Sequence, residues 1–355
     1  MFKKFLTLFF SIIFSLIIVE LFLKFFLPQD LTAPFRVYGK NGLILNIKNS
    51  DAKHSLRGEK MADYKFGDFH NRIYDIQNKN RKILVLGDSY TFGWLIEDEN
   101  TYIYKLNKKF KDFYFINASA GGWGASDQLR YLIDFCDIIK PEYTLIFMNA
   151  GDLIRARRSN LFYLDINEDL IAGENKKIQL KEILKGNFFY RFLTENFHTI
   201  NFLRQIIAEK TVNNPIIQKN VNKQNIQNLK KNEKKLNDKE TLLKDDYKLI
   251  KKIYLKIKEE ANKCNTSLIL INLGWYNYNN EKINENIHYS LNKFIKNNKN
   301  FFKKNFFTFV DLNNEMNEIH TNTEKYTLKY DKHPNILGND YIYKKVYANL
   351  KNLIK

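Results

Sequence analysis

The segment RKILVLGDSYTFG, residues 81–93, decides how this chain folds. Its four apolar residues, Ile83 to Leu86, end abruptly at Gly87 and Asp88. This pattern is typical of a buried parallel strand that stops at a turn. Ligands of α/β proteins bind beyond the carboxyl ends of such strands, so Ser89 is expected where a ligand would bind.

The same pattern of a short apolar run, a turn and a helix recurs downstream. Further strands are expected at residues 113–117, 143–148, 267–272 and 307–311. Helices are expected near residues 99–110, through 129–132, and near 247–263, 287–296 and 338–354. Repeated strand–turn–helix units predict a three-layer α/β/α protein with a flavodoxin-like, doubly wound parallel sheet.

The N-terminus predicts one transmembrane helix before this domain. Residues 5–27 are almost entirely apolar and would span about 34 Å as a helix, enough for a bilayer core. Glu20 and Lys24 interrupt the run, and their i,i+4 spacing suits a pair near its outer end. Lys3 and Lys4 favour an N-terminus inside the cell.

A cleaved signal peptide is the alternative for this segment. Its apolar region is usually shorter and ends in small residues, whereas Pro28-Gln29-Asp30 follows here. We therefore expect a single-pass protein of the bacterial inner (cytoplasmic) membrane with an extracytoplasmic, periplasmic body. The expected organisation is an anchor at 1–27, a juxtamembrane segment at 28–80, and a domain at 81–355 with an exposed Lys/Asn-rich insertion near 207–245, partly helical or disordered.

Composition sets limits on the partners. The formal net charge is +18, but the lysines are spread among Asn and Ile without a recognition motif. We therefore expect no nucleic-acid partner, and the charge suits an anionic membrane surface. The two cysteines, Cys136 and Cys264, show no metal-binding spacing; a bridge is conceivable, but buried free thiols are the favoured interpretation.

A serine hydroxyl becomes a good nucleophile only when a base takes its proton and a third group orients that base. His333 has the context for this role, because Asp331 precedes it by two residues on a loop before the final helix. The alternative is that Gly-Asp-Ser is an ordinary turn and that Asp331 belongs to a turn and caps the final helix. The remaining five histidines are expected to be surface or structural residues: His54, His70, His198, His288 and His320.

Three stretches together resemble the SGNH (GDSL-type) hydrolase superfamily. They are GDSYTFG at 87–93, INASAGGWGASDQ at 116–128 and YDKHPNILG at 330–338. The continuation WLIEDENTYIYKL at 94–106 is similar to a membrane-anchored bacterial subgroup. The resemblance implies that Gly122 supplies an oxyanion-binding N–H. The Asp-x-His spacing resembles that of polysaccharide O-acetyltransferases in the superfamily.

The third block of the superfamily is altered in this chain. Members usually carry Gly-x-Asn-Asp, whereas residues 149–152 read Asn-Ala-Gly-Asp, which puts Gly151 at the expected asparagine position. Either Asn149 supplies the missing amide or that donor is absent. Loss of one such donor typically lowers the rate about a hundred- to a thousandfold.

The resemblance implies a serine ester hydrolase or O-acyltransferase that works through an acyl-serine intermediate. Ser89 would attack the acyl carbon, His333 would carry the proton, and Asp331 would orient His333. The backbone N–H groups of Ser89 and Gly122, with Asn149 as a third donor, would hold the oxyanion. This chemistry requires neither a metal nor an organic cofactor.

The expected substrates are O-acetyl groups of a cell-envelope glycan, with lipid esters as a second class. The non-enzymatic alternative is a catalytically silent envelope protein that binds a glycan or an assembly partner. Trp94, Trp123 and Trp275 are candidates for a sugar platform, although packing is the more frequent role. Arg155, Arg157 and Arg158 are candidates for contact with an anionic substrate, although a solvated helix face is favoured.

Overall fold

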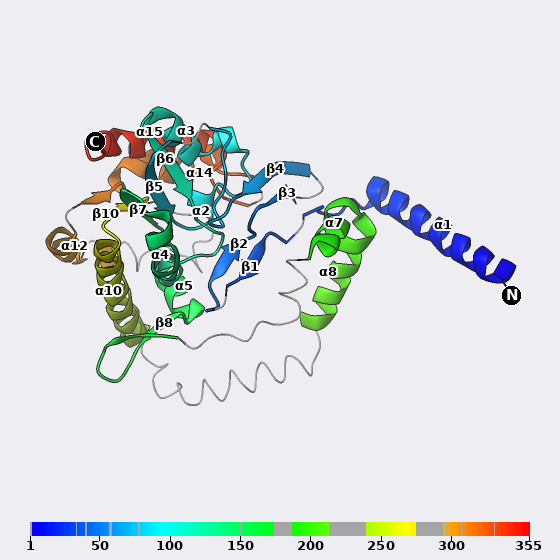
Figure 1. The fold of residues 1–355 in the computed structure, drawn as a ribbon, viewed down its shortest axis with the longest axis horizontal. Helices are drawn as coiled ribbons and strands as arrows, with labels where there is room; N and C mark the ends of the chain where they lie inside the picture. The colour runs from blue at the N-terminus through cyan, green and yellow to red at the C-terminus, as the bar shows by residue number, and fades with distance from the viewer. Residues whose placement is uncertain are drawn as a thin grey trace.

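The central sheet of the computed structural model has five parallel strands in the order β11-β10-β7-β5-β6 (Figure 1). They are β5 (Arg81–Leu86), β6 (Phe113–Asn117), β7 (Tyr143–Met148), β10 (Ser267–Asn272) and β11 (Phe309–Asp311). Numbered along the chain this order is 2-1-3-4-5, the flavodoxin-like arrangement, so the predicted fold class is confirmed. The structure describes residues 2–32, 34–39, 41–56, 59–76, 79–149, 151–173, 187–212, 239–274, 294–295, 297–306, 308–329 and 331–355.

The strand order creates one switch point, between β5 and β7. From β5 the chain moves outward to β6 and then crosses back to β7, which pairs with the other edge of β5. Loops that leave β5 and β7 therefore diverge, and the space between them is where ligands bind in such sheets. Both the Gly87–Ser89 turn and the altered third block lie at this point.

Helices cover both faces of the sheet because its strands alternate between two apolar cores. Leu84 and Leu86 of β5 pack in one core, and Ile83 and Val85 pack in the other. The first face carries α4 (Ala125–Ile139), α5 (Asp152–Ser159) and α10 (Lys239–Lys263). The second carries α3 (Tyr102–Lys109), η2 (Asn314–Met316), α13 (Asn317–Thr321), α14 (Thr323–Tyr326) and α15 (Ile336–Leu350).

Smaller elements complete the domain. They are α2 (Ser89–Phe92), η1 (Asp98–Asn100), β8 (Phe162–Leu164), β9 (Leu170–Ala172) and α12 (Lys299–Asn305). Most of the helix expected at 287–296 and most of the expected insertion lie outside the described residues. The ends of that insertion are helical, because α8 (His198–Val212) runs into it and α10 begins at Lys239.

The segment before β5 contains four strands for which the sequence predicted no element. They are β1 (Arg36–Tyr38), β2 (Ile44–Asn46), β3 (Ser50–Leu56) and β4 (Glu59–Phe66), paired as two antiparallel ribbons. Side chains from these ribbons, including Tyr64 and Phe66, form a third core around Phe92 of α2. Residues 36–66 are therefore packed directly behind the turn that carries Ser89.

The N-terminal helix α1 (Phe2–Phe26) extends away from the rest of the molecule (Figure 1). Its length, and a mean hydropathy of 2.6 over an 18-residue window, allow it to cross a membrane, and a signal sequence has the same character. Almost all its side chains are exposed, whereas Leu23 is buried. Beside its C-terminal end lie α7 (Phe188–Asn196) and α8.

The two cysteines are joined in a disulfide, so the favoured interpretation of free thiols was wrong. Cys136 near the end of α4 and Cys264 just after α10 are 128 residues apart, yet their Cα atoms lie 6.1 Å from each other. The reason is tertiary, because α4 and α10 pack side by side on one face of the sheet. No local spacing in the sequence reports such a contact.

Replacing both cysteines with alanine is expected to lower the free energy of unfolding by about 2–5 kcal/mol, because a long loop of the unfolded chain is no longer closed. Denaturant titration of the two proteins measures the difference. Treatment with a reducing agent should destabilise the wild-type protein to the same level and leave the double variant unchanged. Equal midpoints for both proteins without reductant would contradict the expectation.

Candidate active site

Ser89 lies at the first position of α2, immediately beyond the carboxyl end of β5. The Asp88 carboxylate accepts a hydrogen bond from the Tyr90 N–H at 2.9 Å and so caps this single helical turn. Gly93 ends the turn at φ +82°, a conformation that favours glycine. Ser89 itself is 6% exposed.

His333 reaches Ser89 from the loop between α14 and α15. Its carbonyl accepts the Leu328 N–H at 2.8 Å, and the Asn335 side chain caps α15 at 2.9 Å from the Gly338 N–H. These contacts fix both flanks of the histidine. The His333 Nε2 atom lies 2.8 Å from Ser89 Oγ, and Nδ1 contacts the Asp331 carboxylate.

The structure thus brings Ser89 together with His333, 244 positions away in the sequence, and with Asp331. Asp331 accepts from Nδ1, which leaves Nε2 as the acceptor for the serine proton. Burial lowers the pKa of His333 to about 4, while Asp88 acts to raise it and Arg155 to lower it. At neutral pH the imidazole is therefore uncharged and able to act as a base.

Two backbone N–H groups follow the paired strands β5 and β6. Gly122, in the turn after β6, has φ +86°. Within the described residues, the N–H groups of Ser89 and Gly122 donate to no protein acceptor. Because β5 and β6 are paired in parallel, both donors lie at the same edge of the sheet.

Asn149 follows β7 and points at the residue beside the nucleophile. Its Nδ2 atom donates to Asp88 Oδ2 at 3.0 Å, and its own N–H donates to Asp152 at 3.1 Å. The same Asp88 oxygen accepts from Arg155 Nη1 at 2.7 Å. An amide is therefore present at the switch point, although Gly151 occupies the position at which the family pattern places asparagine.

Arg155 is not on a solvated helix face, so that expectation was wrong for this residue. It is half-buried and ion-paired with the buried Asp88, and it also donates to the Trp123 carbonyl at 3.2 Å. The expectation of a solvated face fits Arg157 and Arg158, which are both exposed. Of these two, Arg157 pairs with Asp246.

The tryptophans differ in role. Trp123 is completely buried and packs in the core, with its Nε1 directed at the Ile44 carbonyl. Trp94 lies beside the site, with its ring 6.0 Å from that of His333 and 4.4 Å from that of His54. Trp275 lies outside the described residues.

A pocket of about 1000 Å³ opens next to Trp94. Arg36 lines it beside Trp94, with its guanidinium 5.5 Å from the centre of the Trp94 ring, and donates to the Gly121 carbonyl at 3.3 Å. Arg36 therefore connects the turn after β6 to the pocket. Other residues that line the pocket are Pro28, Gln29, Asp30, Thr32, Pro34, Phe35, His54, Tyr190, Asn201, Arg204, Gln205 and Ile207.

Other histidines have structural contacts, as expected. His54 is buried and hydrogen-bonded to Tyr64 at 2.9 Å, and burial lowers its pKa to about 3. His70 contacts the Asn46 carbonyl at 2.6 Å, and His198 accepts the Gln29 N–H at 2.9 Å. His288 and the side chain of His320 lie outside the described part of the chain.

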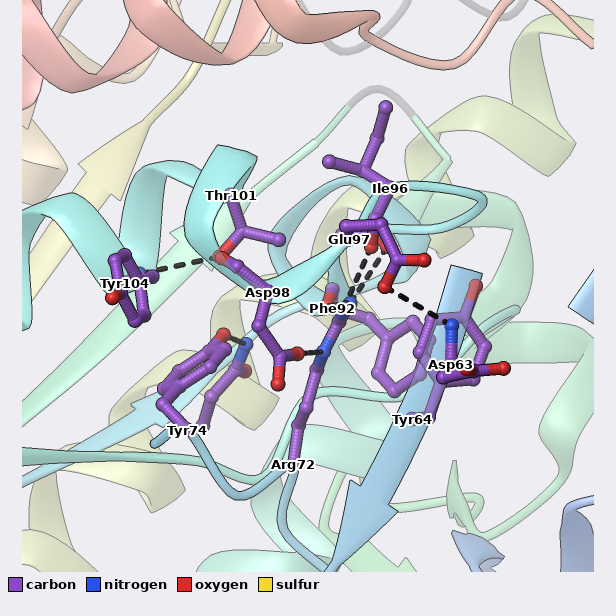
Figure 2. Close-up of polar contacts among 12 residues, drawn as sticks. Asp63, Tyr64, Arg72, Tyr74, Phe92, Ile96, Glu97, Asp98, Thr101 and Tyr104 are labelled. Atoms are coloured by element: carbon purple, nitrogen blue, oxygen red, sulfur yellow. Dashed lines mark hydrogen bonds and ion pairs between the residues drawn. The ribbon is translucent and has the colours of Figure 1, made fainter. Parts of the chain in front are cut away.

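Arg72 was missed by the sequence analysis and holds the loop that follows Ser89 (Figure 2). Its side chain is fully buried beneath residues 92–98. Nη1 donates to the carbonyls of Phe92 and Gly93 at 3.0 and 2.8 Å, and Nη2 donates to that of Ile96 at 2.6 Å. Nε pairs with Asp98 at 2.7 Å, as Figure 2 shows.

The backbone of Arg72 extends this network to the sheet. Its N–H donates to the Asn117 carbonyl at 2.8 Å, and the Asn117 amide donates to Thr91 at 2.9 Å and to the Tyr74 hydroxyl at 2.8 Å. The guanidinium also lies 4.5 Å from the centre of the Tyr64 ring. A lone arginine without a motif carries no local signal of such a role.

The fold and these contacts define an α/β protein of flavodoxin-like strand order with a Ser–His–Asp arrangement at its switch point. No protein-family model matches the chain, and no curated protein matches it. Within the described residues, no group of three or more His, Cys, Asp or Glu side chains is placed to hold a metal ion.

Several solved structures are similar to the chain over most of its length. The esterase EstA from Pseudoalteromonas matches at TM-score 0.40 and 13% identity, covering 78% of this chain and 99% of that one. The acetyl xylan esterase AlAXEase matches at 0.39 and 15%, covering 76% and 99%. A lipolytic G-D-S-L protein from Veillonella parvula matches at 0.42 and 11%, covering 77% and 99%. The fold class follows from the chain's own strand order, and the geometry of the site follows from its own contacts.

Arg72→Lys is expected to destabilise the protein by about 3 kcal/mol, because an ammonium cannot replace the four hydrogen bonds of the buried guanidinium. We also expect reactivity of Ser89 to fall at temperatures where the variant is folded. Denaturant titration and the rate of serine labelling measure the two effects. Arg158→Lys, at an exposed position of α5, is the control and should change stability by less than about 0.5 kcal/mol. A folded Arg72→Lys protein with wild-type labelling would contradict the positioning role.

Proposed function

We propose that this protein is a serine ester hydrolase or O-acyltransferase of the SGNH type. The observation that carries the proposal is the 2.8 Å contact between His333 Nε2 and Ser89 Oγ, with Asp331 on the other ring nitrogen. The neutral state of His333 supports it, because only an uncharged imidazole accepts the serine proton.

The proposed reaction has two stages. Ser89 Oγ attacks the acyl carbon while His333 Nε2 takes its proton, and the C–O bond to the alcohol then breaks as His333 returns that proton to the leaving oxygen. The acyl-serine is next attacked by water, for hydrolysis, or by a sugar hydroxyl, for transfer. His333 again removes a proton from the attacking oxygen and gives it to Ser89.

The negative charge of each tetrahedral intermediate requires donors at the switch point. We propose the N–H groups of Ser89 and Gly122 and an N–H of the Asn149 amide. The contact of Asn149 with Asp88 supports this role, since it holds the amide beside the nucleophile. In this proposal Asn149 replaces the asparagine that the family pattern places two residues later.

The proposed substrates are O-acetyl groups of a cell-envelope glycan, met on the outer side of the cytoplasmic membrane. Three features support an envelope location: the apolar α1, the Cys136–Cys264 disulfide, and a net charge suited to anionic lipids. Disulfides persist in oxidising compartments and are rare in the cytosol. Trp94 and the adjacent pocket offer an aromatic wall for a sugar ring.

Active-site labelling with a fluorophosphonate probe tests the proposed function. Full-length wild-type protein is expected to be labelled, and Ser89→Ala and His333→Ala are each expected to lose labelling. The labelling rate should fall only as the pH drops toward about 4, because protonation of His333 removes the base below its pKa.

Ser126→Ala is the matched control for Ser89→Ala, because Ser126 is also buried but donates to the Ala156 carbonyl, away from the triad. It should be labelled like the wild type. A folded wild-type protein that takes up no probe would instead favour the catalytically silent binding protein.

Asn149→Ala is expected to lower the turnover rate about 100- to 1000-fold with little change in KM, because an oxyanion donor acts only in the transition state. Steady-state kinetics on a chromogenic acetate ester measure the effect. Asn167→Ala, at an exposed position, serves as the matched control. Unchanged turnover in a folded Asn149→Ala protein would show that this amide is not the third donor.

A further inference from the structure

The hairpin formed by α7 and α8 carries apolar side chains that no other described part of the chain covers. Phe188 and Phe192 share one face of α7, and Leu203 and Ile207 share one face of α8, because residues four apart align on a helix. The exposed fractions are 80% for Phe188, 65% for Phe189, 45% for Phe192, 38% for Phe197, 49% for Leu203 and 64% for Ile207.

This hairpin is joined to α1 by a carboxylate within the apolar helix. The spacing of Glu20 and Lys24 predicted that they would pair, but Glu20 instead caps the N-terminus of α8. It accepts hydrogen bonds from the His198 N–H at 2.7 Å and from the Thr199 N–H and hydroxyl at 2.8 and 2.6 Å. The positive end of the α8 dipole therefore meets this charge.

The position of Glu20 sets the depth of the hairpin. Glu20 is six residues from the end of α1 at Phe26, which corresponds to about 9 Å along the helix. Amphipathic helices that lie on membranes bury their apolar face about 5–10 Å into the boundary between headgroups and acyl chains. If α1 crosses a bilayer, the start of α8 lies at this depth.

The hairpin is also fixed to the body of the protein. Arg191 of α7 is buried and donates to the Ser50 hydroxyl and the Asp51 carbonyl at the start of β3. The Asn201 amide donates to the Thr194 carbonyl at 2.6 Å and so ties α8 to α7. The hairpin thus lies between α1 and the strands behind the Ser89 turn (Figure 1).

The pocket beside the active site lies between these same parts. Tyr190 and Arg204 line it from the hairpin, and Arg36 and Trp94 line it from the catalytic side. Arg36 is exposed and contacts the Gly121 carbonyl next to the proposed oxyanion glycine. The pocket therefore extends from the hairpin to Trp94, whose ring lies 6.0 Å from that of His333.

We propose that the α7–α8 hairpin lies in the interfacial layer of the bilayer that α1 crosses, and that the pocket receives an ester or acceptor carried on a membrane lipid. The inference about substrate rests on the proposed function of Ser89, whereas the seating of the hairpin does not. We expect the bilayer to cover the apolar face of the hairpin, because this face is continuous with a helix of membrane-spanning length.

Spin labelling of the full-length protein in nanodiscs with anionic lipid tests the seating. Nitroxides are attached at Phe197→Cys and Ile207→Cys, while the native disulfide keeps Cys136 and Cys264 from reacting. Both labels are expected to be several-fold more accessible to oxygen than to a water-soluble nickel chelate. Ile166→Cys, at a 98% exposed isoleucine between β8 and β9, is the matched control and should show the reverse.

Two results would overturn the seating. Hairpin labels that resemble Ile166→Cys would place the hairpin in water, and labels shielded from both reagents would mean that a protein surface covers it. Both substitutions are at exposed positions, so the fold should be retained, and circular dichroism checks this.

The substrate class is tested with two fluorophosphonates, one with a long alkyl chain inserted in the nanodisc and one with a water-soluble chain. Wild-type protein is expected to react at least about ten times faster with the alkyl probe. Phe188→Ser combined with Phe192→Ser should remove this preference and leave the rate with the soluble probe unchanged.

The two probes distinguish failure of the lipid-borne substrate inference from failure of the proposed function of Ser89. Equal rates for wild type and variant with the alkyl probe would refute lipid-borne delivery while Ser89 remains reactive. Absence of reaction with both probes would refute the proposed function, and with it the substrate inference, while the spin labels would still report where the hairpin lies.

Discussion

The buried guanidinium of Arg72 is the interaction on which the arrangement of the site depends. A buried arginine is tolerable only when its donors are satisfied, and this one is satisfied by one carboxylate and three carbonyls of a single loop. That loop begins where the Ser89 turn ends. The requirement to satisfy one charge therefore fixes the backbone beside the nucleophile and joins it to the strands at residues 36–66.

A second buried charge organises the opposite side of the switch point. Asp88 caps the turn that holds Ser89, pairs with Arg155 and receives the Asn149 amide. One carboxylate thus aligns elements that follow β5 and β7. This explains how an altered third block can still present an amide, because the partner that orients it precedes the nucleophile directly.

The contacts at the end of α1 also satisfy a charged side chain. Glu20 is unfavourable in an apolar helix unless its oxygens are satisfied, and the start of α8 supplies three donors. Arg191 then connects α7 to β3. Through these two contacts the anchor, the hairpin and the pocket beside the site form one connected structure.

The sequence alone determined the elements whose signals are local. Apolar runs that end in turns gave the strands of the sheet, and their alternation with helices predicted its flavodoxin-like class. The positions of Ser89, Asp331 and His333 followed from short motifs at element ends. Tertiary structure decided what depends on packing between distant segments: the Cys136–Cys264 disulfide, the role of Arg72, and the placement of Asn149 and Glu20. Their partners lie far away in sequence, or within a fold-specific turn, so no periodicity or spacing could report them.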